Sequence, residues 1–363
     1  MKNLLRICVI ALAAIPLGSV ARAQEGSSRA EFDCLALTRS SGLGSNGEAS
    51  RFPAFHHVWI PGLVYGTFES NGLRLVYETQ GSGDDVVIVV HGGAGLPHDY
   101  FHPMLSNLSR YAKLVYFDRR ADMQSSRSGH GMASVAEMAD DVDALRLALG
   151  VDRVTLLGHS FGATIALNYA LRYPANVKRL ILVSAAASVE NPAEAEKRIL
   201  KKLSPAEMSN YRSSEGGKGA ASPCDRVRMR YAVLYPHYFY ELSPYEFNRG
   251  AYIAYFDSLA KKIALAEGGR SIDVSGRLRD IQAPALVIAG KHDLVTPPDQ
   301  SDALAKGLPR ARLVVLQRSG HFPFFEENYL FSEWVRQFML ATSNEGGNRL
   351  ARGSAAQSSD DLH

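Results

Sequence analysis

The sequence Gly-His-Ser-Phe-Gly at residues 158–162 has the pattern of a tight turn that presents a serine. An apolar run at 154–157 precedes the turn and predicts a buried strand, and helix-forming residues follow at 163–170. A turn of this kind between a strand and a helix strains the backbone of its serine, and the flanking glycines prevent collisions with neighbouring segments. The pattern therefore predicts that Ser160 is a nucleophile.

A serine hydroxyl is a weak nucleophile at neutral pH, so it needs a base that takes its proton and an acid that orients the base. Asp293 follows the apolar run at 285–289, and His321 follows the run at 313–316. The carboxyl ends of parallel strands meet at one edge of an open α/β sheet, which is where ligands bind. We therefore predict that Ser160, Asp293 and His321 form a catalytic triad.

Structural roles for these residues are also open from the sequence. His321 could be a loop histidine that bonds only to backbone, and Asp293 could cap the helix that follows Pro297. His159 and His292 adjoin the predicted triad, but neighbours in a strand or a tight turn point to different sides. We therefore assign neither of them to the site.

Acyl transfer also requires hydrogen-bond donors at the oxygen that becomes negatively charged. The backbone N–H of Phe161, directly after the serine, is one expected donor. The loop His-Gly-Gly-Ala-Gly at 91–95 follows the apolar run at 86–90, and its glycines allow the backbone to approach a substrate closely. We predict the N–H of Gly93 as the second donor. The alternative is a glycine turn that only reverses the chain.

Apolar runs and helix-like segments alternate along most of the chain, which is typical of a parallel sheet with helices on both faces. A hairpin at 63–79, with Asn71 and Gly72 in its turn, adds two strands at the edge. We predict the α/β class, with an eight-stranded, mostly parallel sheet flanked by helices. The six other predicted strands lie at 86–90, 114–117, 154–157, 180–183, 285–289 and 313–316.

Nearly a hundred residues, 186–282, separate two consecutive predicted strands and are too many for a simple crossover. We interpret this segment as an inserted helical lid. Ten of the 26 residues at 231–256 are aromatic, several of them at helical spacing. These residues either pack the lid onto the core or line a substrate pocket. In the second case, the predicted substrate-binding residues are Tyr235, Phe239, Glu241 and Tyr255.

The start of the chain has the pattern of a secretory signal of 23 residues. Lys2 and Arg6 precede an apolar stretch at 7–17, and Ala-Arg-Ala at 21–23 supplies the small residues of a cleavage site. The alternative is a membrane anchor, but the stretch would form a helix of about 16 Å, about half of a hydrocarbon core. We therefore predict export to a periplasm or out of the cell, without stable membrane insertion after cleavage.

Cleavage would remove Lys2, Arg6 and Arg22 and no acidic residue, so the formal net charge would fall from +3 to 0. A chain without net positive charge gives no support for nucleic-acid binding. Two of the three cysteines, Cys34 and Cys224, would remain. An oxidising compartment would allow them to pair, and the sequence leaves open whether they lie within bridging distance.

The composition divides the mature chain into a core, an insertion and two ends without periodicity. Residues 24–56 are rich in small and polar residues and are predicted to be a flexible extension, and 342–363 are predicted to be a disordered tail. The core is expected at 57–185 and 283–341, on either side of the lid at 186–282.

Together these motifs resemble the α/β-hydrolase superfamily over about residues 60–185 and 283–341. The glycine loop at 91–95, His-Asp-Tyr at 98–100 and the segment 170–174 after the serine resemble the proline iminopeptidase branch. The resemblance implies the α/β-hydrolase fold, removal of an N-terminal proline from peptides, and the triad roles assigned above.

The chain also departs from that branch. It has Ala94 where relatives usually have proline, and its segment 118–125 lacks their Gly-x-Gly. The peptidases hold the substrate amine with lid carboxylates near a tryptophan-rich motif, whereas the two tryptophans here, Trp59 and Trp334, lie outside the lid. These differences concern the activity more than the fold.

The sequence therefore predicts an exported serine hydrolase that cleaves small esters, lactones or amides through an acyl-enzyme on Ser160, without a metal or an organic cofactor. Its partner is expected to be a small-molecule or short-peptide substrate, and the oligomeric state is left open. The alternatives are a proline iminopeptidase, a hydrolase of carbon–carbon bonds, and a ligand-binding protein without catalysis.

Overall fold

The computed structural model describes most of the chain between Gly62 and Ala355. The predicted signal peptide and extension, Cys34, Cys224 and Tyr255 lie outside the described residues. The described ranges are 62–93, 98–102, 104–119, 134–190, 192–216, 229–230, 232–241 and 272–355.

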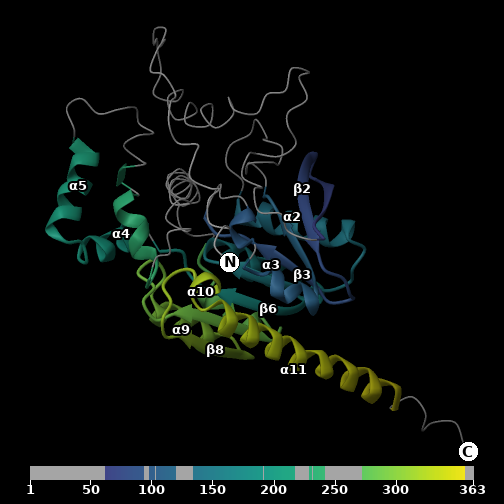
Figure 1. Ribbon diagram of the computed structural model, residues 1–363. Helices are drawn as coiled ribbons and strands as arrows, with labels where there is room; N and C mark the ends of the chain where they lie inside the picture. The colour runs from purple at the N-terminus through teal and green to yellow at the C-terminus, as the bar shows by residue number, and fades with distance from the viewer. Residues whose placement is uncertain are drawn as a thin grey trace, which may run out of the picture.

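Eight strands form one sheet in the order β1-β2-β4-β3-β5-β6-β7-β8 (Figure 1). Strands β3 to β8 run parallel to one another, while β2 is antiparallel to both β1 and β4. This confirms the predicted sheet with a hairpin at its edge. The strands are β1 (Val64–Ser70), β2 (Leu73–Gln80), β3 (Val86–Val90), β4 (Lys113–Phe117), β5 (Val154–His159), β6 (Val177–Val183), β7 (Ala285–Gly290) and β8 (Ala311–Leu316).

The hairpin turn forms at the Asn-Gly pair that the sequence indicates. Asn71 and Gly72 have φ angles of 49° and 73°, which a two-residue turn between twisted strands requires. The register pairs Ser70 with Leu73 across the turn. The edge of the sheet is therefore set by local backbone preference.

Alternate residues of the strands enter two hydrophobic cores on opposite faces of the sheet. In β3, Val86, Ile88 and Val90 face one core, Val87 and Val89 face the other, and each is at most 4% exposed. Burial on both faces explains why the inner strands read as continuous apolar runs.

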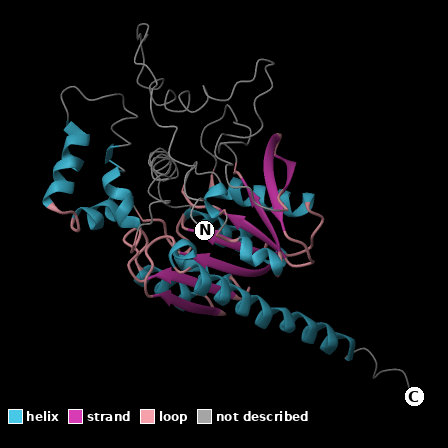
Figure 2. Ribbon diagram, in the orientation of Figure 1, coloured by secondary structure: helices cyan, strands magenta, loops and turns pink. Residues whose placement is uncertain are grey.

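Helices cover both faces of the sheet (Figure 2). The core that contains Val86 receives side chains from α2, α3 and α9, and the core that contains Val87 receives them from η1, η2, α10 and α11. Within the described ranges, no helix is both long and apolar enough to span a bilayer. The helices are η1 (His98–Phe101), η2 (Ser106–Arg110), α2 (Val135–Ala148), α3 (Phe161–Arg172), η3 (Pro174–Asn176), α4 (Pro192–Leu200), α5 (Pro205–Gly216), η4 (Tyr235–Tyr238), η5 (Ser275–Asp280), α9 (Pro298–Gly307), α10 (Pro323–Glu326) and α11 (Asn328–Ala355).

The segment between β6 and β7 is helical wherever its described residues are regular. Its helices α4 and α5 stand apart from the sheet (Figure 1) and contribute to a small apolar cluster of Ile199, Tyr211, Val233 and Leu234. The chain then returns to the main body at η4, whose Tyr235 joins the core that contains Val87. The extent of the lid, 186–282, stays a prediction.

The last helix is longer than the sequence predicted. We expected a disordered tail from residue 342, but α11 continues to Ala355, so the predicted start of the tail is wrong. The hydroxyls of Thr342 and Ser343 donate to backbone carbonyls one turn earlier, at 2.7 and 2.8 Å. Serine and threonine hydroxyls that bond to carbonyls of the preceding turn are compatible with a helix. A composition rich in such residues therefore does not by itself indicate disorder.

A buried arginine connects three parts of the fold. The guanidinium of Arg179 on β6 is fully buried and donates to Asp85 (2.8 Å), which precedes β3, and to Ser343 (3.2 Å) in α11. The ammonium of Lys178 also lies 3.1 Å from Asp85. Burial lowers the pKa of Arg179, and Asp85 opposes this effect. Asp85 therefore offsets part of the cost of burying the charge of Arg179.

The substitution Asp85→Asn should lower the free energy of unfolding by about 2–3 kcal/mol. Breaking a fully buried pair costs about 3–5 kcal/mol, and Asp85 keeps 17% of its side chain exposed, which reduces the loss. Denaturant unfolding measures the difference, with Asp152→Asn, a change of an exposed carboxylate, as the matched control. A loss below about 0.5 kcal/mol in Asp85→Asn would contradict this role.

Candidate active site

Ser160 occupies the turn between β5 and α3, with φ 53° and ψ −122°. Residues other than glycine rarely adopt such a conformation, which costs on the order of 1–3 kcal/mol. The Ser160 N–H donates to the carbonyl of Val183 on β6 (2.9 Å), and the Ser160 carbonyl accepts from the N–H of Ala163 in α3 (2.9 Å). Bonds to a strand and to a helix therefore hold the strained residue in place.

The two glycines of this turn have no room for side chains. A Cβ at Gly158 would lie 2.6 Å from the Cα of Ala163, and a Cβ at Gly162 would overlap the carbonyl of Val90 on β3. The start of α3 is thus in direct backbone contact with β5 and β3, as the glycine pattern predicts.

The structure brings together Asp293 and His321, which were predicted from two separate strand ends. The Nδ1 of His321 lies 2.9 Å from Oδ2 of Asp293, and both side chains are almost fully buried. The other carboxylate oxygen accepts the backbone N–H groups of Val295 and Thr296, each at 2.8 Å, which fixes its orientation. Because the carboxylate accepts the proton of Nδ1, Nε2 of a neutral His321 is left as the basic nitrogen.

His159, the residue before Ser160, connects the serine turn to the His321 loop. Its Nε2–H donates to the carbonyl of His321 (2.9 Å), and its Nδ1 accepts from the hydroxyl of Tyr100 (2.7 Å). The Tyr100 oxygen in turn accepts the N–H of Gly92 (2.7 Å). Burial, together with the nearby His321, lowers the pKa of His159 well below its ordinary value. The ring is therefore neutral and can both donate and accept a hydrogen bond.

The glycine loop after β3 lies directly beside the serine. A Cβ at Gly92 would be 3.1 Å from the Cβ of Ser160. The buried Arg119 donates to the carbonyls of Gly92 (3.4 Å) and Gly93, and its guanidinium lies 5.5 Å from the ring of Phe161. Phe161 is the first residue of α3, so its N–H has no acceptor within the helix. Arg119 therefore contacts both residues predicted to supply the oxyanion donors.

The structure describes three of the four residues predicted to bind substrate. Tyr235 and Phe239 are 2% and 6% exposed and pack in the core that contains Val87. Glu241 is 76% exposed and lies 3.4 Å from the guanidinium of Arg318 on the surface. The rings of Tyr235 and Phe239 pack against Phe322, the residue after His321. Tyr255 lies outside the described residues, and a substrate-binding role for these residues stays a prediction.

Residues 238–241, in the middle of the predicted lid, are bonded to the His321 loop. The N–H of His321 donates to the carbonyl of Tyr238 (2.6 Å), and the two rings meet edge to face at 5.9 Å. One carboxylate oxygen of Glu326 accepts the N–H groups at 240–241 (2.7 and 2.9 Å), and the other accepts that of Gly320 (2.6 Å). Burial raises the pKa of Glu326 despite these bonds. The half-buried Tyr238, within the predicted lid, therefore lies beside the predicted base.

The order of the strands, the strained serine turn and the loops at the carboxyl ends of the strands together define a class of protein. The family model of the α/β hydrolase fold matches residues 85–328, and the chain belongs to this family. The predicted superfamily and fold are confirmed, and membership of this family indicates that the protein is a hydrolase.

Relatives of the chain carry names with different activities. The proline iminopeptidase PfmaB of Pestalotiopsis fici is 27% identical over 276 residues, which cover 75% of this chain and 98% of the relative. RutD of Agrobacterium fabrum, provisionally named a carbamate hydrolase, is 27% identical over 259 residues, which cover 70% of this chain and 92% of that relative. A solved structure of a thermophilic esterase from Thermogutta terrifontis has a TM-score of 0.60 at 22% identity, and the match covers 77% of this chain and 99% of that one. The predicted resemblance to the proline iminopeptidase branch is confirmed.

The sequence did not predict the buried side chains that support the site. Tyr100, Arg119 and Glu326 bond to backbone groups of the glycine loop and of the His321 loop, from 6 to 27 residues away in the sequence. His159 was not assigned to the site, yet it bonds to the loop that carries the predicted base. A signal was available only for Tyr100, which lies in the His-Asp-Tyr motif after the glycine loop.

The substitution Tyr100→Phe should lower kcat for a p-nitrophenyl ester by about 10- to 100-fold and leave KM within about twofold. It removes only the hydroxyl that joins Gly92 to His159, so the reacting groups shift but remain present. Tyr169→Phe is the matched control, because that hydroxyl bonds to Asp143 (2.9 Å) and its ring packs in the opposite core. Steady-state kinetics of both variants test the role, and equal kcat values would contradict it.

Proposed function

We propose that the protein is a serine hydrolase in which Ser160 is the nucleophile, His321 is the base and Asp293 orients the base. The observation that carries the proposal is the strained backbone of Ser160 at the strand-to-helix turn. The hydrogen-bonded His321 and Asp293 follow neighbouring parallel strands whose carboxyl ends lie at the same edge of the sheet. Backbone strain persists where the surrounding structure over-determines it, which occurs chiefly at functional sites.

The proposed reaction has two stages. In the first, Nε2 of His321 takes the proton of the Ser160 hydroxyl while the serine oxygen attacks the acyl carbonyl. The N–H groups of Gly93 and Phe161 bind the oxygen that becomes negative, and losing one such donor costs about 3 kcal/mol of transition-state stabilisation. The protonated histidine then gives its proton to the leaving group, and an acyl-enzyme remains. In the second stage, water that loses a proton to His321 attacks the acyl-enzyme, and His321 returns that proton to the Ser160 oxygen as the acid leaves.

The proposed substrates are small esters, lactones or amides with an apolar acyl or alcohol part. Tyr238 is half-buried beside His321, and its ring stacks on that of Phe322 at 6.5 Å, so the surroundings of the base are aromatic. The carboxylate of Glu241 lies on the surface beside the guanidinium of Arg318, at 3.4 Å. An apolar, aromatic environment favours an uncharged substrate group.

Proline iminopeptidase activity is the second candidate. It is favoured by relatives of that name, among them the protein from Saccharolobus solfataricus, which is 26% identical over 288 residues. This activity needs a lid carboxylate that binds the substrate amine. Glu246 and Asp257, the other acidic residues near the aromatic segment, lie outside the described residues.

A paired substrate panel separates the two candidates. We expect the protein to release p-nitrophenol from short acyl esters at least about 100-fold faster than p-nitroaniline from proline or alanine anilides. The Ser160→Ala variant should lose at least about 10⁴-fold in kcat on every substrate, since the nucleophile is removed. Faster release from the proline anilide would replace the ester proposal with the exopeptidase. Unchanged ester hydrolysis in Ser160→Ala would overturn the mechanism.

We also propose that the chain is exported and loses residues 1–23. The charged start, the apolar stretch and the small residues before Gln24 support this proposal. Expression of the full chain in a Gram-negative host should give a periplasmic product whose intact mass begins at Gln24. A cytoplasmic product that still carries Lys2 and Arg6 would contradict it.

A further inference from the structure

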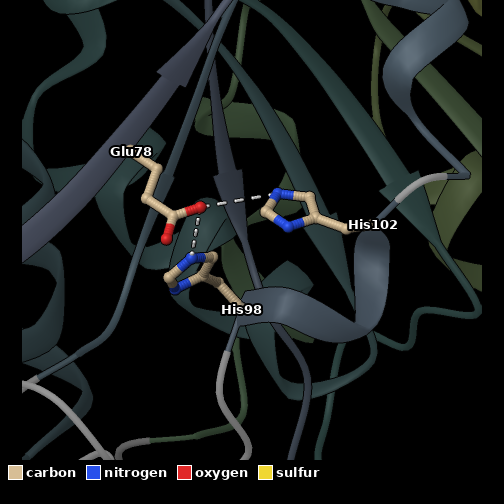
Figure 3. Close-up of side chains that lie close together, drawn as sticks. All are labelled: Glu78, His98 and His102. Carbon is tan, nitrogen blue, oxygen red and sulfur yellow. Dashed lines mark ion pairs between the residues drawn. The ribbon is translucent and has the colours of Figure 1, made fainter. Parts of the chain in front are cut away.

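Two histidines and a carboxylate converge in the interior, and the proposed reaction uses none of them. Glu78 lies on β2, and His98 and His102 lie in and just after η1 (Figure 3). Oε2 of Glu78 is 3.2 Å from Nε2 of His98 and 3.8 Å from Nε2 of His102. The three potential ligand atoms lie within 4.8 Å of one another, and all three residues are buried.

The spacing of these atoms fits a small cation between them. Zinc bonds to nitrogen and oxygen ligands of about 2.0–2.2 Å, so neighbouring ligand atoms of a tetrahedral site lie about 3.3 Å apart. Figure 3 shows both imidazole rings turning Nε2 toward the same carboxylate oxygen. Two imidazole nitrogens and a carboxylate oxygen form a donor set that zinc takes in proteins.

A second carboxylate orients one of the two rings. Oδ1 of Asp118, at the end of β4, lies 2.7 Å from Nδ1 of His98 and also accepts the backbone N–H of His98 (3.0 Å). This bond keeps a proton on Nδ1 and turns Nε2 toward Glu78. Metal-binding histidines usually have such a carboxylate behind them, because it fixes the tautomer and the direction of the ring.

The cluster is closed to solvent. Glu78, His98 and Asp118 are 0% exposed, and His102 is 4% exposed. Ionisable groups this far from water are usually paired with each other or bound to a metal ion.

We propose that Glu78, His98 and His102 bind one divalent transition metal ion, with zinc as the preferred ion for this donor set. The three residues supply three ligands of a tetrahedral site and connect β2 to the turn at η1. Tyr100 lies between the two histidines in that turn, and its hydroxyl bonds to Gly92 beside the serine. The metal is thus structural: it fixes the turn that positions the glycine loop. Full burial means that the metal is taken up as the chain folds.

Metal content after refolding tests the proposal. The full chain, produced without a metal-affinity tag, is unfolded with a chelator, refolded with zinc, freed of loose metal and measured by elemental mass spectrometry. We expect about one zinc per chain and a higher Tm than after refolding without zinc. A folded protein that retains less than about 0.1 zinc per chain would overturn the proposal.

Matched variants locate the metal. His102→Gln should lower the retained zinc at least about 10-fold, whereas His237→Gln, which changes a half-buried histidine paired with Glu207 (3.2 Å), should retain it. Equal retention by His102→Gln would overturn the assignment. If His102→Gln does not fold, the visible absorption spectrum of the cobalt-loaded protein tests the proposal instead. The wild-type chain refolded with Co²⁺ should show the bands of a tetrahedral nitrogen and oxygen site. A folded chain without these bands contradicts the proposal.

Discussion

The structure of the site depends on the backbone contact between α3 and the strands beside its start. Because Gly162 has no side chain, the helix begins against the carbonyl of Val90, and Ser160 is held at positive φ. The strand order supports this contact. Because β5 lies between β3 and β6, both neighbouring strands touch the serine turn. Without this contact the strain would relax and the hydroxyl would move away from the strand ends.

The other parts of the site are fixed to this turn mainly through backbone groups. Tyr100 and His159 join the N–H of Gly92 to the carbonyl of His321, and Glu326 bonds to the N–H of the residue before that histidine. Loops that contribute single reacting groups are thus held as one unit by buried side chains. Such a fully bonded network is rigid because every member would lose its partner if one loop moved.

The features that the sequence predicted correctly are those encoded by local patterns. Strand number, the edge hairpin and the strained turn follow from apolar runs and glycine positions. Asp293 and His321 were chosen because they follow predicted strands; they are hydrogen-bonded to each other, and their catalytic roles stay predictions. Aromatic residues that line a pocket and aromatic residues that pack in a core can have the same spacing in the sequence. The sequence therefore could not predict that Tyr235 is buried. Glu78 and His98 are distant in sequence and meet only when β2 pairs with β4 and η1 packs beside them.

In the proposed mechanism, His321 activates Ser160 as a nucleophile. The most direct measurement exposes the folded protein to a fluorophosphonate, records the intact mass and maps the modified peptide. We expect one adduct per chain, on Ser160, that forms at least about 100-fold more slowly in the His321→Ala variant. An adduct on another residue, no adduct on the folded protein, or an equal rate in His321→Ala would contradict this mechanism.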